Sequence, residues 1–89
     1  MAKVTIYTRQ FCGFCSSAIR LLQEKGADYE EIDATFEPDK RAEMMARSKR
    51  QTFPQIFIGS RHVGGCDELY ALDRQGRLEP MLAGEEAAS

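Results

Sequence analysis

Two cysteines separated by two residues, Cys12 and Cys15, constrain this chain more than any other feature. They follow the alternating, β-rich segment Lys3–Tyr7, which predicts a strand, and they open a segment with helical periodicity. Cys12 is therefore expected where a strand ends and a helix begins. The first N–H groups and the dipole of a helix stabilise negative charge, so this position favours a thiolate. A thiolate is a nucleophile or a metal ligand, and both uses have to be weighed.

The rest of the chain alternates between strand-like and helix-like patterns. Apolar residues at helical spacing predict a helix from Cys12 to Lys25, which Gly26 ends. The other expected elements are strands over 29–33, 55–58 and 61–63, a helix over 38–48 with Ala42, Met45 and Ala46 inward, a helix from Cys66 to near Gly76, and a last short helix holding Leu78, Met81 and Leu82. A βαβ unit followed by a hairpin predicts an α/β fold, with one mixed four-stranded sheet and helices on both faces.

Length, charge and cysteine count narrow the function classes. The 89 residues fit a single domain, 1–89, with 84–89 as a flexible tail. A net charge of −2 argues against a nucleic-acid partner, and no segment approaches the ~20 apolar residues of a membrane helix. No signal peptide is visible, and three cysteines do not form an even-numbered disulfide framework. We expect a cytoplasmic monomer, in a compartment where a C-x-x-C is redox-active or metal-bound.

Three motifs in order carry a family resemblance. They are Tyr7 to Cys15, Thr52 to Ile58, and Gly64 to Leu69. Together they resemble a glutaredoxin, and the chain is most similar to the short bacterial dithiol class. The resemblance implies a thioredoxin-like fold and glutathione-dependent reduction of protein disulfides and glutathione mixed disulfides. It also implies Cys12 as the nucleophile, Cys15 as the resolving thiol, and a cis-proline at Pro54 opposite them.

The resemblance further implies a glutathione site. The main chain at Thr52 and Phe53 would pair with the ligand, the helix start after Gly65 would bind its γ-glutamyl carboxylate, and a cation would bind its glycyl carboxylate. The predicted binding residues are Arg9, Cys12, Phe14, Arg50 (or Lys40), Thr52, Phe53, Pro54, Gly65, Cys66 and Asp67. Simpler interpretations stay open: Arg9 as a solvated loop charge, Phe53 as core, Cys66 as a buried free thiol and Asp67 as a helix cap.

The middle of the redox motif departs from the family pattern. Gly13 and Phe14 stand where C-P-Y-C is common in the family, and C-G-F resembles single-cysteine members that carry iron–sulfur clusters. The retained Cys15 places the chain in the dithiol class. The alternative function is a carrier in which two chains share a [2Fe–2S] cluster through Cys12 and glutathione.

A zinc module is the other alternative. Cys12, Cys15, His62 and Cys66 have the side chains of a Cys₃His site. His62, however, falls in a predicted strand, where we expect an exposed hairpin residue, and a glycine break separates it from Cys66. The apolar pattern also supports folding without metal. The sequence therefore favours thiol chemistry over zinc binding.

Overall fold

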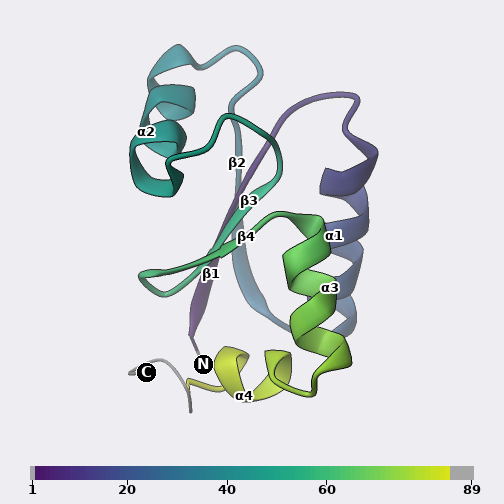
Figure 1. The fold of residues 1–89 in the computed structure, drawn as a ribbon. Helices are drawn as coiled ribbons and strands as arrows, with labels where there is room; N and C mark the ends of the chain where they lie inside the picture. Colours follow the sequence, from purple (N-terminus) through teal and green to yellow (C-terminus); the bar gives the residue numbers. More distant parts are fainter. Residues whose placement is uncertain (1, 85–89) are drawn as a thin grey trace.

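The computed structural model describes residues 2–84, which contain one four-stranded mixed sheet (Figure 1). Its strands are β1 (Lys3–Thr8), β2 (Asp28–Asp33), β3 (Gln55–Ile58) and β4 (Arg61–Gly64), in the spatial order β2-β1-β3-β4. β2 runs parallel to β1, whereas β3 is antiparallel to both β1 and β4. A helical crossover suits the parallel pair and a tight turn suits the hairpin. The predicted α/β class and mixed sheet are confirmed.

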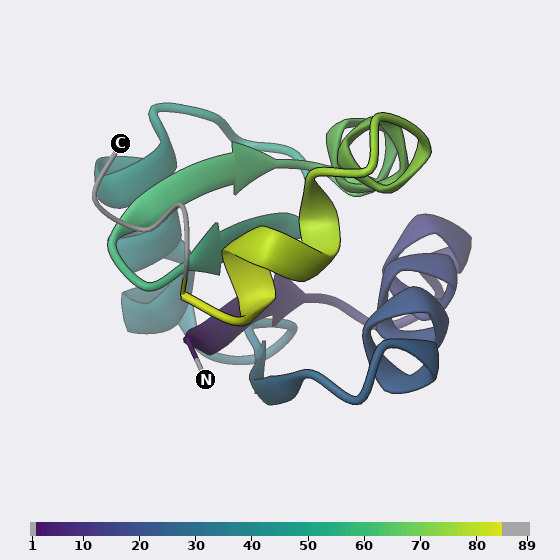
Figure 2. The same ribbon diagram turned by 90° about the horizontal axis from the view of Figure 1, so that it is seen from below.

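Within residues 2–84, four helices surround the sheet: α1 (Gly13–Glu24), α2 (Pro38–Ser48), α3 (Cys66–Arg74) and α4 (Leu78–Leu82). α1 and α3 lie side by side on one face and α2 lies on the other (Figure 2). The main core lies between the sheet and α1, α3 and α4. Alternate strand residues and one stripe of each helix form it: Val4, Ile6, Ile56, Ile58, Ala18, Leu22, Leu69, Leu78, Met81 and Leu82. The sheet therefore has helices on both faces, as predicted.

A two-residue turn sets the hairpin register. Ile58 pairs with Arg61, so Gly59 and Ser60 form the turn between β3 and β4. Gly59 has φ +60°, a left-handed conformation that glycine adopts without steric cost. A positive φ at the first turn position suits the twist of a hairpin. The predicted hairpin is confirmed.

The inward face of α2 differs from the prediction. Ala42, Met45 and Ala46 were the expected inward positions, but all three are exposed. Met44 and Ser48 are buried in their place. The predicted face is therefore wrong, although the bounds of the helix agree with the sequence.

Polar contacts hold α2 in its observed orientation. The Tyr7 hydroxyl, fully buried on β1, donates to Glu43 and accepts from Nη1 of Arg47 at 2.9 Å. The Arg47 guanidinium also lies 4.1 Å from the ring centroid of Phe57. Met44, next to Glu43 in sequence, packs against Tyr7 and Phe57 on the same face. Glu43, which is half-buried, and Arg47, which is exposed, thus contact the sheet from α2, and the apolar periodicity of the helix does not indicate these contacts.

The ends of the chain add two observations. The Ala2 N–H donates to the Leu82 carbonyl oxygen at 2.8 Å, which ties the start of the chain to α4. Of the predicted flexible tail, 84–89, only Gly84 lies within the described residues. None of the helices in residues 2–84 has the length and apolar character needed to cross a membrane. The single-domain boundary 1–89 stays a prediction.

Candidate active site

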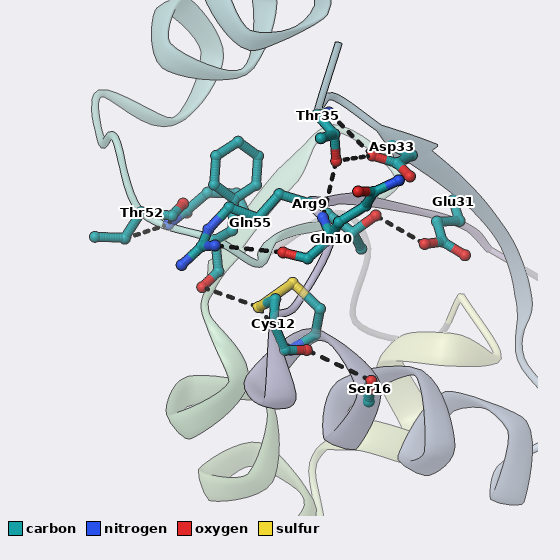
Figure 3. Close-up of a disulfide and its surroundings, with 12 residues drawn as sticks. Arg9, Gln10, Cys12, Ser16, Glu31, Asp33, Thr35, Thr52 and Gln55 are labelled. Atoms are coloured by element: carbon teal, nitrogen blue, oxygen red, sulfur yellow. Dashed lines mark hydrogen bonds between the residues drawn. A yellow bond between two sulfur atoms is a disulfide. The ribbon is translucent and has the colours of Figure 1, made fainter. Parts of the chain in front are cut away.

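The cysteine pair lies at the start of α1. Cys12 is the N-cap residue with an extended backbone, and a disulfide joins it to Cys15 across a Cα–Cα distance of 5.2 Å. Figure 3 shows this disulfide, with Arg9 and Thr52 on one side of it and Ser16 on the other. The Cys15 N–H donates to Cys12 Sγ at 3.1 Å. Cys15 is buried and Cys12 is half-buried, so Cys12 carries the more accessible sulfur.

A cavity of about 200 Å³ opens beside the redox pair. Phe53 lines the cavity, and its carbonyl oxygen lies 3.9 Å from Cys12 Sγ. The Phe53–Pro54 peptide bond is cis, as the resemblance implies. Every residue predicted to bind ligand lines this cavity, except Arg9 and Cys12. Glu68, which was not predicted, lines it as well. The lining residues are Phe14, Arg50, Thr52, Phe53, Pro54, Gly65, Cys66, Asp67 and Glu68. Two loops far apart in the sequence therefore converge beside Cys12.

A buried amide supports the loop that carries Phe53. Gln55 is fully buried, and its Nε2 donates to the carbonyl oxygen and the hydroxyl of Thr52 at 3.0 and 3.1 Å. Its Oε1 lies 2.8 Å from Nε2 of His62, which is therefore the donor, because an amide oxygen only accepts. His62 lies in the hairpin strand β4 as predicted, but it is half-buried rather than exposed. Burial, with the nearby charge of Arg50, lowers the pKa of His62.

Glu68 is a site residue that the sequence analysis missed. Its Oε1 accepts from the Gly65 N–H at 2.6 Å and lies 3.3 Å from Nη1 of Arg50. The bond from Gly65 is the main cause that lowers the pKa of Glu68. Gly65 is the N-cap of α3, so Asp67 is not the cap and lies exposed in the first turn. A glutamate three residues after the N-cap is capping-box spacing, the signal that identifies Glu68.

The two remaining predicted cations lie outside the cavity. Lys40 has its Nζ 3.7 Å from Oε1 of Glu43, both on α2, and it does not line the cavity. Arg50 does line it, so the structure favours Arg50 over Lys40 as the candidate for the glycyl carboxylate. Arg9 lines a neighbouring cleft that shares Thr52 with the cavity.

The four proposed zinc ligands do not come together. Within residues 2–84, no group of three or more histidine, cysteine, aspartate or glutamate side chains is placed to hold a metal ion. Cys12 and Cys15 are bonded to each other, and His62 is engaged with Gln55. Cys66 is a buried free thiol, as one of its two interpretations predicts. Burial, with the charges of the acidic residues that follow it, raises the pKa of Cys66.

Comparison with known proteins decides the family. A family model described as Glutaredoxin matches residues 4–63. The chain belongs to the glutaredoxin family. Glutaredoxin 3 of Escherichia coli (strain K12) is 50% identical over 82 residues, which span 92% of this chain and 99% of the relative. The solution structure of glutaredoxin from Brucella melitensis is 58% identical, with a TM-score of 0.81, over 92% of this chain and 89% of that one.

A third relative was solved with a ligand. The crystal structure of a buckwheat glutaredoxin–glutathione complex has a TM-score of 0.84 and 32% identity, over 93% of this chain and 78% of that chain. The thioredoxin-like fold is thus confirmed. The chain is a glutaredoxin-type disulfide oxidoreductase, and Cys12 and Cys15 fit the C-x-x-C active site of that class.

Proposed function

We propose that this glutaredoxin uses glutathione to reduce protein disulfides and glutathione mixed disulfides, with Cys12 as the nucleophile and Cys15 as the resolving thiol. The observation that carries the proposal is the cavity beside the redox pair, because Phe53 lines it and has its carbonyl oxygen 3.9 Å from Cys12 Sγ. The buckwheat glutaredoxin–glutathione complex supports it, because a relative with the same fold binds this tripeptide.

The cavity matches the charges of glutathione. Glu68 already accepts the Gly65 N–H, so the N–H groups of Cys66 and Asp67 are left in the first turn of α3 for the γ-glutamyl carboxylate. The Asp67 carboxylate is exposed there for the ligand's amino group. Arg50 supplies a cation for the glycyl carboxylate, which would compete with Glu68 for it. The cavity thus offers a positive and a negative partner to an extended peptide that has two carboxylates and one ammonium group.

The helix start gives Cys12 its chemistry. In the reduced protein the Cys15 N–H, which lies 3.1 Å from Cys12 Sγ in the disulfide, would stabilise a Cys12 thiolate together with the α1 dipole. The first turn of α1 holds no acidic residue that would oppose that charge. Cys12 is therefore the sulfur that attacks.

Two exchange sequences follow. With a glutathione mixed disulfide, the Cys12 thiolate attacks the glutathione sulfur, and the substrate leaves as a thiolate that takes a proton from water. A second glutathione thiolate then attacks the glutathione bound to Cys12, which releases glutathione disulfide and the Cys12 thiolate. With a protein disulfide, Cys12 forms a mixed disulfide and Cys15 displaces the reduced product. This leaves the Cys12–Cys15 disulfide of the structure, which two glutathione molecules reduce.

The decisive assay follows glutathione-dependent reduction of the mixed disulfide between glutathione and mercaptoethanol. Cys12→Ser should abolish turnover, because it removes the attacking sulfur. Cys15→Ser is the matched control, since the same substitution three residues away should retain this reaction and lose reduction of protein disulfides. Full activity in Cys12→Ser would end the proposal.

The proposed function also indicates where the protein acts and on which substrates. A free Cys66 thiol and an exchanging cysteine pair suit the reducing cytoplasm, where disulfide-bonded or glutathionylated proteins are the substrates. The monomeric state stays a prediction. The shared [2Fe–2S] cluster also stays a prediction, because it needs two chains, and the described residues of one chain hold no metal-binding group.

A further inference from the structure

A side-chain hydrogen bond holds the loop that leads into Cys12. This loop, residues 9–12, joins the end of β1 to the start of α1. The Gln10 N–H donates to the Thr35 hydroxyl oxygen at 2.8 Å (Figure 3). Within residues 2–84, this is the one hydrogen bond between residues 9–11 and another segment, since Arg9 donates to its neighbour Gln10. Thr35 thus connects the loop to the segment that follows β2.

Asp33 fixes the direction of the Thr35 hydroxyl. Asp33 is the last residue of β2 and pairs with Thr8 of β1, so its place on the sheet is set by the strand ladder. Its Oδ1 accepts the Thr35 N–H at 2.9 Å and also accepts the Thr35 hydroxyl proton. These bonds, that of the hydroxyl above all, lower the pKa of Asp33. Because its proton is given to Asp33, the hydroxyl oxygen is left to accept from Gln10.

The loop contains a backbone conformation that needs such support. Phe11 has φ +56°, in the left-handed region, which is unusual for a bulky side chain. Its ring gains little packing in return, since the residue is 98% exposed. A residue in such a conformation persists only when its surroundings hold it. Phe11 is held on one side by the bond between Gln10 and Thr35, and on the other by the first turn of α1.

The sulfur of Cys12 depends on the same stretch of backbone. Cys12 caps α1 with φ −119° and ψ 100°, and its Sγ accepts the Cys15 N–H at 3.1 Å. This bond and the α1 dipole are the groups that stabilise a thiolate at this position. Because β1 is fixed in the sheet, a change of φ at Phe11 moves the residues that follow it, beginning with Cys12. The support of the loop therefore bears on the reactivity of the thiol.

We propose that Thr35 is a positioning residue for Cys12. Its hydroxyl, directed by Asp33, holds the Gln10 N–H and so keeps the loop in the conformation that places the Cys12 sulfur at the start of α1. The inference rests on the proposed function, in which the Cys12 thiolate attacks. Thr35 does not line the proposed glutathione cavity, and it acts through the main chain of the loop. Without its hydroxyl, Phe11 leaves the left-handed region more readily, and the sulfur spends less time against the helix N–H groups.

The test measures the Cys12 thiolate by alkylation. The thiolate displaces iodide from iodoacetamide, so the rate at a series of pH values reports the ionised fraction of the thiol. All proteins carry Cys15→Ser and Cys66→Ala, which leave Cys12 as the single thiol. Thr35→Val removes the hydroxyl without a change of charge. Below the midpoint of the profile the rate should fall roughly two- to fivefold, the effect of a helix N-terminus on an adjacent negative charge.

Three further variants assign this effect to the loop. Thr35→Ser, which restores the hydroxyl, should return the rate to that of the parent protein. Thr5→Val on β1 makes the same change away from the loop, and this matched control should leave the profile unchanged. Phe11→Gly should reduce the effect of Thr35→Val, because glycine adopts φ +56° without steric cost. An equal effect of Thr35→Val in both backgrounds would refute the proposal, since Thr35 would then not act through the loop.

Urea unfolding separates positioning from a purely structural role. If Thr35→Val lowers the unfolding free energy but is alkylated with the profile of the parent protein, the proposal is refuted. The proposed function is tested separately, because alkylation needs no glutathione. Wild-type protein that does not turn over the mixed disulfide of glutathione and mercaptoethanol would refute that function, whereas an unchanged alkylation profile in Thr35→Val refutes the positioning role alone.

Discussion

Removal of one buried hydroxyl should measurably destabilise this glutaredoxin. Tyr7→Phe keeps the fully buried ring on β1 but deletes the oxygen that donates to Glu43 and accepts from Arg47. These bonds are the polar link between the sheet and α2. The substitution therefore tests whether charged residues, rather than apolar periodicity, set the orientation of that helix.

The expected loss of stability depends on how Glu43 and Arg47 are satisfied once the Tyr7 hydroxyl is removed. A hydrogen bond to a charged group contributes ~1.5–3 kcal/mol, and two such bonds end at this hydroxyl. The Glu43 side chain is 41% exposed, so water replaces part of its bond. Arg47 keeps its stacking over the Phe57 ring at 4.1 Å. Both points reduce the net loss from the sum of the two bonds to about the lower end of one such bond, about 1.5–2 kcal/mol. For a domain of this size this lowers Tm by about 6–16 °C.

Urea unfolding followed by far-UV circular dichroism measures this loss. Tyr29→Phe is the matched control: its hydroxyl accepts one bond, from Gln23 Nε2 at 3.0 Å on the exposed surface, so the loss should stay below ~0.5 kcal/mol. Glu43 gives a second readout. Its bond from Tyr7 is the main cause that lowers its pKa, so wild-type stability falls as pH drops below ~4.5, and Tyr7→Phe should flatten this fall. Equal stability of the two Tyr→Phe variants would refute the reasoning.

Three further outcomes are expected. Met44→Ala should cost about 2–5 kcal/mol in urea unfolding because Met44 is fully buried, whereas Met45→Ala should stay within ~0.5 kcal/mol; the reverse order would restore the predicted face of α2. As the pH is lowered from 6.5 to 5, the unfolding free energy should fall. The unfolded chain protonates its single histidine near pH 6.5, whereas burial lowers the pKa of His62 in the folded protein. The same pH dependence in His62→Gln would contradict this. Above pH 9 the unfolding free energy should fall again, because burial raises the pKa of Cys66 in the folded protein. Cys66→Ala should reduce this fall in the same titration. An identical fall in the variant would show that other groups cause it.

The redox motif and the sheet were predictable because short-range patterns determine them. Strand alternation at Lys3–Tyr7, helical spacing after Cys12 and the Gly59–Ser60 turn each act over a few residues, and the structure agrees with all three. The convergence of Thr52 and Gly65 beside Cys12 required the family resemblance, because no local pattern measures the distance between loops.

The errors share one physical cause, which is a polar side chain bonded to a buried polar partner on another element. The hairpin position predicts an exposed His62, but the side chain is half-buried because the buried Gln55 accepts its Nε2–H at 2.8 Å. Periodicity likewise misplaces the inward face of α2, because Glu43 and Arg47 bond to the buried Tyr7 hydroxyl. A polar group can be buried when it has a partner, and that partner lies on another element of the chain.

The same polar contacts reach the redox pair. Thr52 is held from β4 through Gln55 and His62, and the next residue, Phe53, is contacted from α2 by the Arg41 guanidinium. The Phe53 carbonyl oxygen then lies 3.9 Å from Cys12 Sγ. The loop opposite the thiol is therefore positioned by residues of β3, β4 and α2, all outside the C-x-x-C motif. The cysteines specify the exchange chemistry, whereas in the proposed function this loop supplies part of the surface that glutathione contacts beside Cys12.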